Sequence, residues 1–444
     1  MKLWDKGYSI ESKIEQYTVG QDRELDVHLA PYDVLGSLAH AQMLQSVGLL
    51  SEEELKGLQQ ELKQIYRQIA AGQFQIDEGV EDVHSQVELL LTRALGDAGK
   101  KVHSARSRND QVLVDIKMYL RAEVKEIVAL VSELFETLIA AGEQYRGVLI
   151  PGYTHLQAAM PSSFGLWFSA WAESLADDLR LLLAAYGLIN QNPLGSGAGY
   201  GSSLPINRSL TTELLGFDGL HVNVINAQLS RGKTEQALAF ALAGLGQTLG
   251  KLAMDVCLYN SQNFGFLTFP DALTTGSSIM PHKKNPDVFE LMRAKSNRLL
   301  ALPNEINLLT SNLPSGYHRD FQLLKEILFP ALQQLKESLS LCSYMLQRVQ
   351  INPDAIQDEK YTYIYSVEEV NKKVLAGVPF RQAYKEVGDA IADGSYSPQT
   401  QVEHTHEGSI GNLGLDLIRQ KFEGVLGQFG FAKWEGAFER LLAE

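Results

Sequence analysis

The chain has 444 residues, of which 45% are hydrophobic and 21% are charged, and its formal net charge is −14 at pH 7. This length allows two or three domains with a substantial buried core, and the composition is ordinary for a soluble protein. The negative charge argues against a nucleic-acid partner, because affinity for phosphate backbones rests largely on Lys and Arg. It does not exclude a small anionic substrate, since a few cationic groups in a cleft set the local potential.

The N-terminus and the cysteines indicate a compartment. Residues 1–6 lack the apolar core of a signal peptide, and no uncharged apolar run approaches ~18 residues. Cys257 and Cys342 lie in apolar helical patterns, which is typical of buried thiols in a reducing compartment. We therefore expect a cytoplasmic protein without a membrane partner.

Residues 1–104 are predicted to form an N-terminal helical domain. Apolar residues recur at three- and four-residue spacing in segments near 31–47, 51–71 and 80–95. The stretch 77–79 breaks the pattern between the last two. Strand-like alternation is almost absent along the chain, so the predicted fold class is all-α.

Residues 105–352 are predicted to form a central bundle of long helices. The first runs from Asn109 to about Tyr145, roughly ten turns. Pro161 lies where a first-turn proline would, so a second helix is expected from there to about Ile189. The others are expected at about 233–264, after Pro286, and at about 319–349, where Pro330 should kink the helix or interrupt its hydrogen bonds.

Several of these helices are apolar over more than one face. Residues 237–245 read Ala-Leu-Ala-Phe-Ala-Leu-Ala-Gly-Leu. Such faces suit a helix surrounded by other helices, including helices of partner subunits. The alternative is a bundle that packs only within one chain. We favour an oligomer.

Residues 353–444 are predicted to form a small C-terminal helical domain, which begins after the turn signal at 352–353. Breaks at 377–379 and 393–395 divide it into short helices. No metal-ligand spacing, phosphate-loop motif or dinucleotide fingerprint stands out, so we expect no bound metal and no cofactor.

The segment 275–286, Thr-Gly-Ser-Ser-Ile-Met-Pro-His-Lys-Lys-Asn-Pro, carries the strongest chemical signal. Gly276 permits a tight turn, and Pro281 and Pro286 exclude an ordinary helix interior. The segment offers backbone N–H groups, two hydroxyls, an ammonium and a carboxamide to one small anion. An enzyme needs such groups to hold a carboxylate while a proton leaves the adjacent carbon. An ordinary surface loop is the alternative.

This segment resembles the signature loop of the fumarase/aspartase superfamily of lyases. Residues 101–112, and 151–157 followed by Pro161, are similar to the first two motifs of its argininosuccinate lyase family. The similarity continues in 35–40, 81–84 and 194–198. The resemblance implies an enzyme that cleaves argininosuccinate to arginine and fumarate by β-elimination, in the last step of arginine biosynthesis. It also implies a homotetramer whose active sites are shared between subunits, working without a cofactor.

The resemblance also implies the catalytic residues. Elimination needs a base for the carbon-bound proton, donors for the developing charge and an acid for the leaving nitrogen. Ser277 would be the base, active as an alkoxide beside Lys283 and backbone amides. His155 would be the acid, oriented by Glu290. The residues alone do not distinguish Ser277 from Ser278, and His155 and Glu290 have ordinary structural alternatives.

The substrate-binding residues follow from the same resemblance. Two carboxylates and a guanidinium need both cations and acceptors. The expected substrate-binding residues supply both: Asn109, Thr154, Ser278, Asn285, Tyr317, Gln322 and Lys325. For the last three of these, the alternative interpretation is a polar start of a helix.

Three stretches depart from the family pattern. Residues 19–22, Val-Gly-Gln-Asp, stand where many members have an Asn-x-Ser segment, and 199–205 and 228–233 also differ. These departures affect the expected detailed geometry of the active site more than the expected class of reaction. The competing hypotheses are an adenylosuccinate lyase, or a structural protein that kept the fold and lost catalysis. The stretches 107–111 and 317–322 favour the first assignment, and the complete set of site residues argues against a loss of catalysis.

Overall fold

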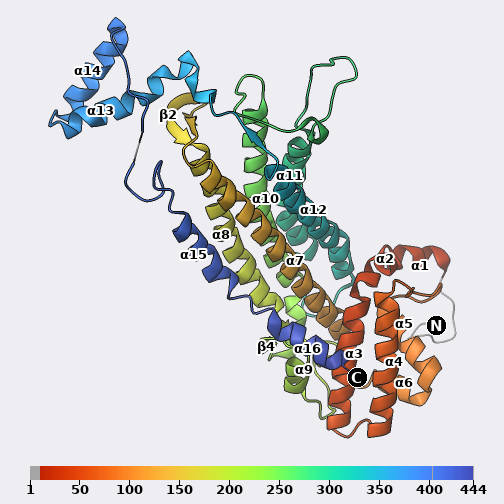
Figure 1. Ribbon diagram of the computed structural model, residues 1–444. Coiled ribbons are helices and arrows are strands. Elements are labelled where there is room, and N and C mark those ends of the chain that lie inside the picture. The colour runs from red at the N-terminus through yellow and green to blue at the C-terminus, as the bar shows by residue number, and fades with distance from the viewer. Residues whose placement is uncertain (1–10, 403, 444) are drawn as a thin grey trace.

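The computed structural model describes residues 11–402 and 404–443, and it shows an elongated molecule built mainly of helices (Figure 1). The expectation about residues 1–6 lies outside this range. Within the described residues, the strands are short and pair in three two-stranded sheets. The predicted helical fold class is confirmed.

The first part of the chain forms the lower end of the molecule in Figure 1. The three predicted segments are α3 (Ala30–Ser46), α4 (Glu52–Ala70) and α5 (Val83–Leu95). A capping box starts α4, because the Ser51 side chain accepts from Glu54 N and the Glu54 side chain accepts from Ser51 N. The apolar spacing did not predict the remaining short helices here: α1 (Ser12–Val19), α2 (Asp22–Asp26), η1 (Val27–Leu29) and α6 (Asp97–Lys101).

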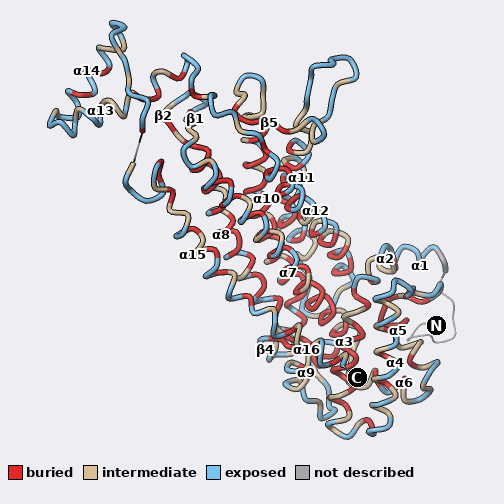
Figure 2. Tube along the Cα trace, viewed as in Figure 1, coloured by how far each residue is buried: buried red, intermediate tan, exposed pale blue. Residues whose placement is uncertain are grey.

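Long helices run from this lower end to the upper end of the molecule. They are α7 (Arg108–Gln144), α8 (Phe164–Ile189), α10 (Val224–Asn260), α11 (Asp287–Thr310) and α12 (Leu323–Leu346). Their facing sides are buried (Figure 2) and share one hydrophobic core with the N-terminal helices. Ser107 starts α7 in a second capping box with Asp110.

The predicted start of the second long helix was wrong. Pro161 lies in a strand, not in a first helical turn, because β1 (Leu149–Thr154) and β2 (Gln157–Ser163) form an antiparallel hairpin in which Pro151 faces Pro161. The helix α8 begins only after Ser163, whose side chain accepts a hydrogen bond from Leu166 N. Proline is as compatible with an extended edge as with a helix start.

The predicted boundaries of two other helices also differ from the structure. α10 begins near Val224, where Asn223 caps it, but Arg231 and Gly232 interrupt its helical geometry. Gly232 has φ of 80°, a left-handed conformation that favours glycine. The regular helix therefore does resume near the predicted residue 233. At the fifth helix, residues 319–322 form a 3-10 turn, η3 (Arg319–Gln322), before α12 starts.

The C-terminal part divides in two. α13 (Ser366–Leu375) and α14 (Phe380–Asp393) pack on each other around a small separate core of Val370, Ala383 and Val387. α15 (Leu415–Leu426) returns along α8, and α16 (Ala432–Leu442) contacts α3 and α9 (Arg208–Leu214) at the lower end. The division into three domains stays a proposal. The last part of the chain, α15 and α16, folds back onto the bundle and the N-terminal helices.

Short elements connect these helices. They are β3 (Gln191–Asn192), α9 (Arg208–Leu214), β4 (Gly219–Leu220), β5 (Leu267–Thr268), η2 (Asp271–Leu273), β6 (Gln350–Ile351), η4 (Ala355–Gln357) and η5 (Glu359–Tyr365). Strands β3 and β4 are parallel, whereas β5 and β6 are antiparallel and join the segments that follow α10 and α12.

Burial also bears on the cysteines and on α10. Cys342 is buried as expected, whereas Cys257 is only half-buried, and both are free thiols. Among the described helices, α10 alone is long and apolar enough to cross a membrane, and 56% of its most apolar stretch is buried within the protein.

Candidate active site

The signature segment forms a loop at the upper end of the molecule, between η2 and α11 (Figure 1). Thr275 and Asn285 close its base, because Asn285 N donates to Thr275 O at 2.8 Å and Thr275 N donates to Asn285 O at 3.4 Å. The Asn285 side chain also donates to Gly276 O at 3.4 Å. Most residues of the loop are exposed, including Ser278 and Lys283. A single protomer therefore presents these polar groups outward.

The two serines of this loop have different surroundings. Ser277 Oγ accepts hydrogen bonds from Ile279 N at 3.3 Å and from Met280 N at 3.1 Å. Within the described residues, the Ser278 hydroxyl has no hydrogen-bond partner. Two amide dipoles aimed at one oxygen stabilise negative charge on it. The geometry therefore favours Ser277 over Ser278 as the residue that carries an alkoxide.

Thr154 and His155 lie at the tip of the β1–β2 hairpin, also at the upper end. Thr154 pairs with Gln157, so His155 and Leu156 are the central residues of a two-residue turn. Both have positive φ, 53° for His155 and 59° for Leu156. This conformation costs non-glycine residues of order 1–3 kcal/mol, and such strain clusters at functional sites. The turn leaves the His155 side chain exposed.

Glu290, the predicted partner of His155, is exposed in the first turn of α11. Among the described residues of this protomer, no hydrogen bond or ion pair joins the two side chains. Their pairing stays a prediction.

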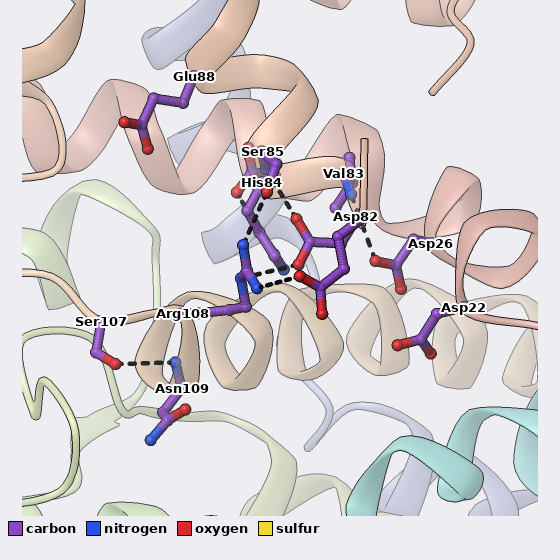
Figure 3. A network of polar contacts seen from close by, with 12 residues as sticks. Asp22, Asp26, Asp82, Val83, His84, Ser85, Glu88, Ser107, Arg108 and Asn109 are labelled. Carbon is purple, nitrogen blue, oxygen red and sulfur yellow. Dashed lines mark hydrogen bonds and ion pairs between the residues drawn. The ribbon is translucent and has the colours of Figure 1, made fainter. Parts of the chain in front are cut away.

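Asn109 lies at the opposite, lower end, in the first turn of α7, where its backbone N–H donates to Ser107 Oγ at 3.3 Å. Its neighbour Arg108 is held by the segment before α5, with Nε 2.8 Å from Asp82 Oδ2 (Figure 3). Nη1 of Arg108 lies 3.2 Å from Glu81 Oε2. These acidic residues fix the start of α7. In the sequence, Glu81 and Asp82 stand out only through the family resemblance of residues 81–84.

Gln322 and Lys325 also lie at the lower end, and both are buried. Gln322 Nε2 donates to Val19 O at 2.9 Å and to Thr18 O at 3.2 Å. Lys325 Nζ lies 2.7 Å from Asp22 Oδ1 and also pairs with Asp26. The N-terminal segment α1–α2 therefore lies against the predicted arginine-side residues. Tyr317, in the loop before η3, is exposed.

Arg319 links these two lower-end clusters. Its Nη2 lies 2.7 Å from Glu81 Oε1, and its Nη1 donates to Thr18 O at 3.0 Å. Because Glu81 also contacts Arg108, a continuous polar network joins the start of α7 to the 317–325 segment. The local sequence carried no signal for this network, since its members are far apart along the chain.

The 194–198 stretch joins the same end of the molecule through Asp110. Asp110 Oδ2 accepts from Gly195 N and from Gly197 N, both at 2.9 Å. Burial raises the pKa of Asp110 to about 6, although the backbone amides that bond to it act in the opposite direction. Two stretches noted for their family resemblance are thus in direct contact.

One buried cluster has the residue types of a metal site: Asp33, His84 and Asp115. His84 Nδ1 lies 2.8 Å from Asp33 Oδ1 and 3.4 Å from Asp115 Oδ2. Burial lowers the pKa of His84, but the carboxylates around it outweigh burial and raise it overall. The contacts of the imidazole with two acidic groups account for this geometry, so we assign no metal to the cluster.

The predicted site residues therefore form two groups in one protomer. The upper group comprises Thr154, His155, Ser277, Ser278, Lys283, Asn285 and Glu290, and the lower group comprises Asn109, Tyr317, Gln322 and Lys325. The 37 residues of α7 span ~55 Å between the two ends, at 1.5 Å per residue. A surface cavity of 430 Å³ lined by Glu136 and Gln144 contains none of them. One protomer does not bring the two groups together.

This helical fold is that of a lyase. The sequence profile of the lyase family matches residues 11–300. The chain is also similar in fold to solved lyases: EDDS lyase in complex with formate (TM-score 0.75, 21% identity, covering 98% of this chain and 94% of the other), and class II fumarase from Schistosoma mansoni (TM-score 0.72, 16% identity, covering 89% and 91%).

Curated relatives narrow the class. The chain is 57% identical over 441 residues to the argininosuccinate lyase of Parabacteroides distasonis, covering 99% of each chain. It is 39% identical over 427 residues to that of Xanthomonas campestris pv. campestris, covering 95% of this chain and 99% of the relative. The chain belongs to the argininosuccinate lyase family, which confirms the family prediction.

Proposed function

We propose that the chain cleaves argininosuccinate to arginine and fumarate by β-elimination, as the last step of arginine biosynthesis. The observation that carries the proposal is the 57% identity to argininosuccinate lyases over 99% of the chain. The complete set of polar residues expected for the reaction supports catalysis over a purely structural role.

Ser277 is the proposed base. Its Oγ removes a proton from the succinyl carbon next to a carboxylate, and the electron pair is held as a carboxylate dianion. The two amides that donate to Oγ stabilise the alkoxide form. The Lys283 ammonium and the Ser278 and Asn285 side chains supply donors for the substrate carboxylates.

His155 is the proposed acid. The electron pair then forms the C=C bond of fumarate with the neighbouring succinyl carbon, the bond from that neighbouring carbon to the guanidino nitrogen breaks, and His155 gives a proton to the nitrogen. Glu290 orients the imidazole, and Thr154 beside it binds a carboxylate. The lower-group residues Asn109, Tyr317, Gln322 and Lys325 bind the rest of the substrate.

The active site is proposed to form between subunits of a homotetramer. The upper and lower groups are separated by the length of α7, so a substrate that contacts both must lie between different chains. Large apolar side chains are exposed along the bundle helices, which suits helix packing between subunits: Leu181, Leu188, Phe240, Met254, Leu291, Leu300 and Leu308. We propose that this enzyme works in the cytoplasm.

Turnover of defined substrates tests the function. The purified protein is given argininosuccinate, adenylosuccinate, aspartate or malate, and fumarate release is followed by ultraviolet absorbance. We expect turnover of argininosuccinate only. A preference for adenylosuccinate would contradict the assignment and favour the other lyase of this superfamily.

A further inference from the structure

The carboxylate of Asp22 is more exposed and has fewer polar contacts than the side chains of its neighbours Lys325 and Asp26. Lys325 and Asp26 have side chains that are 4% and 2% exposed, whereas the Asp22 side chain is 18% exposed. Asp26 is occupied on both oxygens, since Oδ1 pairs with Lys325 and Oδ2 accepts from Val83 N. Among the described residues, only Lys325 contributes a polar contact to the Asp22 carboxylate.

The charges of this cluster do not balance. Lys325 carries one positive charge and is shared by two carboxylates. The other cation that acts on Asp22 is Arg231, and it is itself paired with Glu235 at 2.9 Å. The buried pair of Lys325 and Asp26 is neutral, so among the described residues Asp22 adds one uncompensated negative charge at the edge of this pair. A partly desolvated carboxylate in this state favours a cation as its next partner.

The cluster is held in place next to a predicted substrate residue. Gln322, one turn before Lys325, fixes the carbonyls of Thr18 and Val19 at the end of α1. Gly20, with φ of 54°, then turns the chain into α2, which begins at Asp22. The two hydrogen bonds of Gln322 and the ion pair with Lys325 thus hold Asp22 beside the start of α12.

The proposed substrate has a group that matches this charge. In argininosuccinate the guanidino nitrogen is the leaving group, so it must lie at the upper-group residues that perform the chemistry. The arginine side chain then carries the α-ammonium and α-carboxylate away from them, toward the lower group. A lysine and an aspartate side by side suit such a zwitterion.

Resting on the function proposed above, we infer that Asp22 binds the α-ammonium group of the arginine end and makes the site specific for an α-amino acid. Lys325 lies beside it on the α-carboxylate, and Asp26 keeps Lys325 oriented. Asp22 thus acts as a specificity residue of this chain, in a stretch where the sequence departs from the common family pattern.

Ligands that differ by one group test the inference. Inhibition of fumarate release is measured with arginine, with agmatine (which lacks the α-carboxylate) and with 5-guanidinopentanoate (which lacks the α-amino group). The proteins are the wild type, Asp22→Asn and Glu24→Gln, a matched loss of charge at an exposed position of the same helix. Thermal unfolding confirms that each variant is folded.

We expect the wild type to bind arginine at least about tenfold more tightly than 5-guanidinopentanoate, since the latter leaves the Asp22 carboxylate without a charge-assisted hydrogen bond. In Asp22→Asn, the ratio of the affinities for arginine and 5-guanidinopentanoate should fall below about threefold, and the affinity for agmatine should fall as much as that for arginine. Glu24→Gln should keep the wild-type ratio. An unchanged ratio, or equal weakening of all three ligands, overturns the inference. A wild type that does not turn over argininosuccinate instead refutes the proposed function.

Discussion

The hydroxyl oxygen of Ser277 lies 3.1 Å from the backbone nitrogen of Met280, which donates a hydrogen bond to it. A second amide, that of Ile279, points at the same oxygen. These contacts distinguish Ser277 from Ser278 as the candidate base. The sequence alone did not distinguish the two residues.

Replacement of each serine should therefore have a different effect. Ser277→Ala should lower kcat by at least ~10²–10⁴, the range for a positioned acid or base, with a modest change in KM. Ser278→Ala should cost less and act partly through KM, because it removes a binding donor. Steady-state kinetics of both variants provide the measurement. The reverse order would show that the two roles have been exchanged.

His155→Asn should also be severe, because the leaving nitrogen then lacks its proton donor. Steady-state kinetics of His155→Asn with argininosuccinate provide the measurement. A kcat close to that of the wild type would show that another group is the acid.

The affinity for arginine should depend on pH through Asp22. Burial raises the pKa of Asp22 to about 6, against the lowering effects of Lys325 from α12 and Arg231 from α10, while Asp26 of α2 adds to the rise. Asp22 is thus ionised at neutral pH and loses its charge as the pH falls through about 6. For a pKa of about 6, the ionised fraction falls from ~97% at pH 7.5 to ~24% at pH 5.5.

Arginine inhibition should accordingly weaken about fourfold between those two pH values in the wild type. The dependence should flatten in Asp22→Asn, whose side chain does not titrate. Glu24→Gln provides the control for loss of charge on α2. The same slope in all three proteins would assign the titration to another group.

Close packing of α7 against α8 should make Gly165 sensitive to enlargement. A Cβ at this position would lie 2.7 Å from Arg146 Cα and 2.8 Å from Gly142 O. Gly165→Ala should therefore lower the stability by about 1–3 kcal/mol, the usual cost of overpacking. Gly424→Ala, on α15 with no atom within 4 Å of the new methyl group, should instead stabilise by about 0.5–1 kcal/mol. Thermal unfolding at one fixed protein concentration compares the two.

Local pattern predicted the long helices well and their irregular ends less well. The span from Asn109 to Tyr145 was predicted within one residue at each end, because the apolar spacing is regular and Ser107 caps it. The hairpin before α8 escaped prediction because its turn is His155-Leu156, without the glycine or asparagine that usually marks such a turn.

The candidate site depended more on family resemblance than on pattern. The contact of Lys325 with Asp22 joins residues about three hundred positions apart, and no local spacing predicts it. Periodicity also gave no sign that α7 would separate Asn109 from Ser277. These relationships arise from tertiary packing, whereas the proposed shared site depends on assembly beyond one chain.

Mixed oligomers test the proposed shared site most directly. The proposed tetramers of Asn109→Ala and of Ser277→Ala are dissociated, mixed in equal amounts and reassociated, and fumarate release from argininosuccinate is measured after subtraction of the parental activities. If each site takes Asn109 and Ser277 from different subunits, both are intact with probability one half each, and about a quarter of wild-type activity should return in a closed oligomer. No recovery despite verified subunit exchange would contradict the shared site, because each chain would then supply both residues.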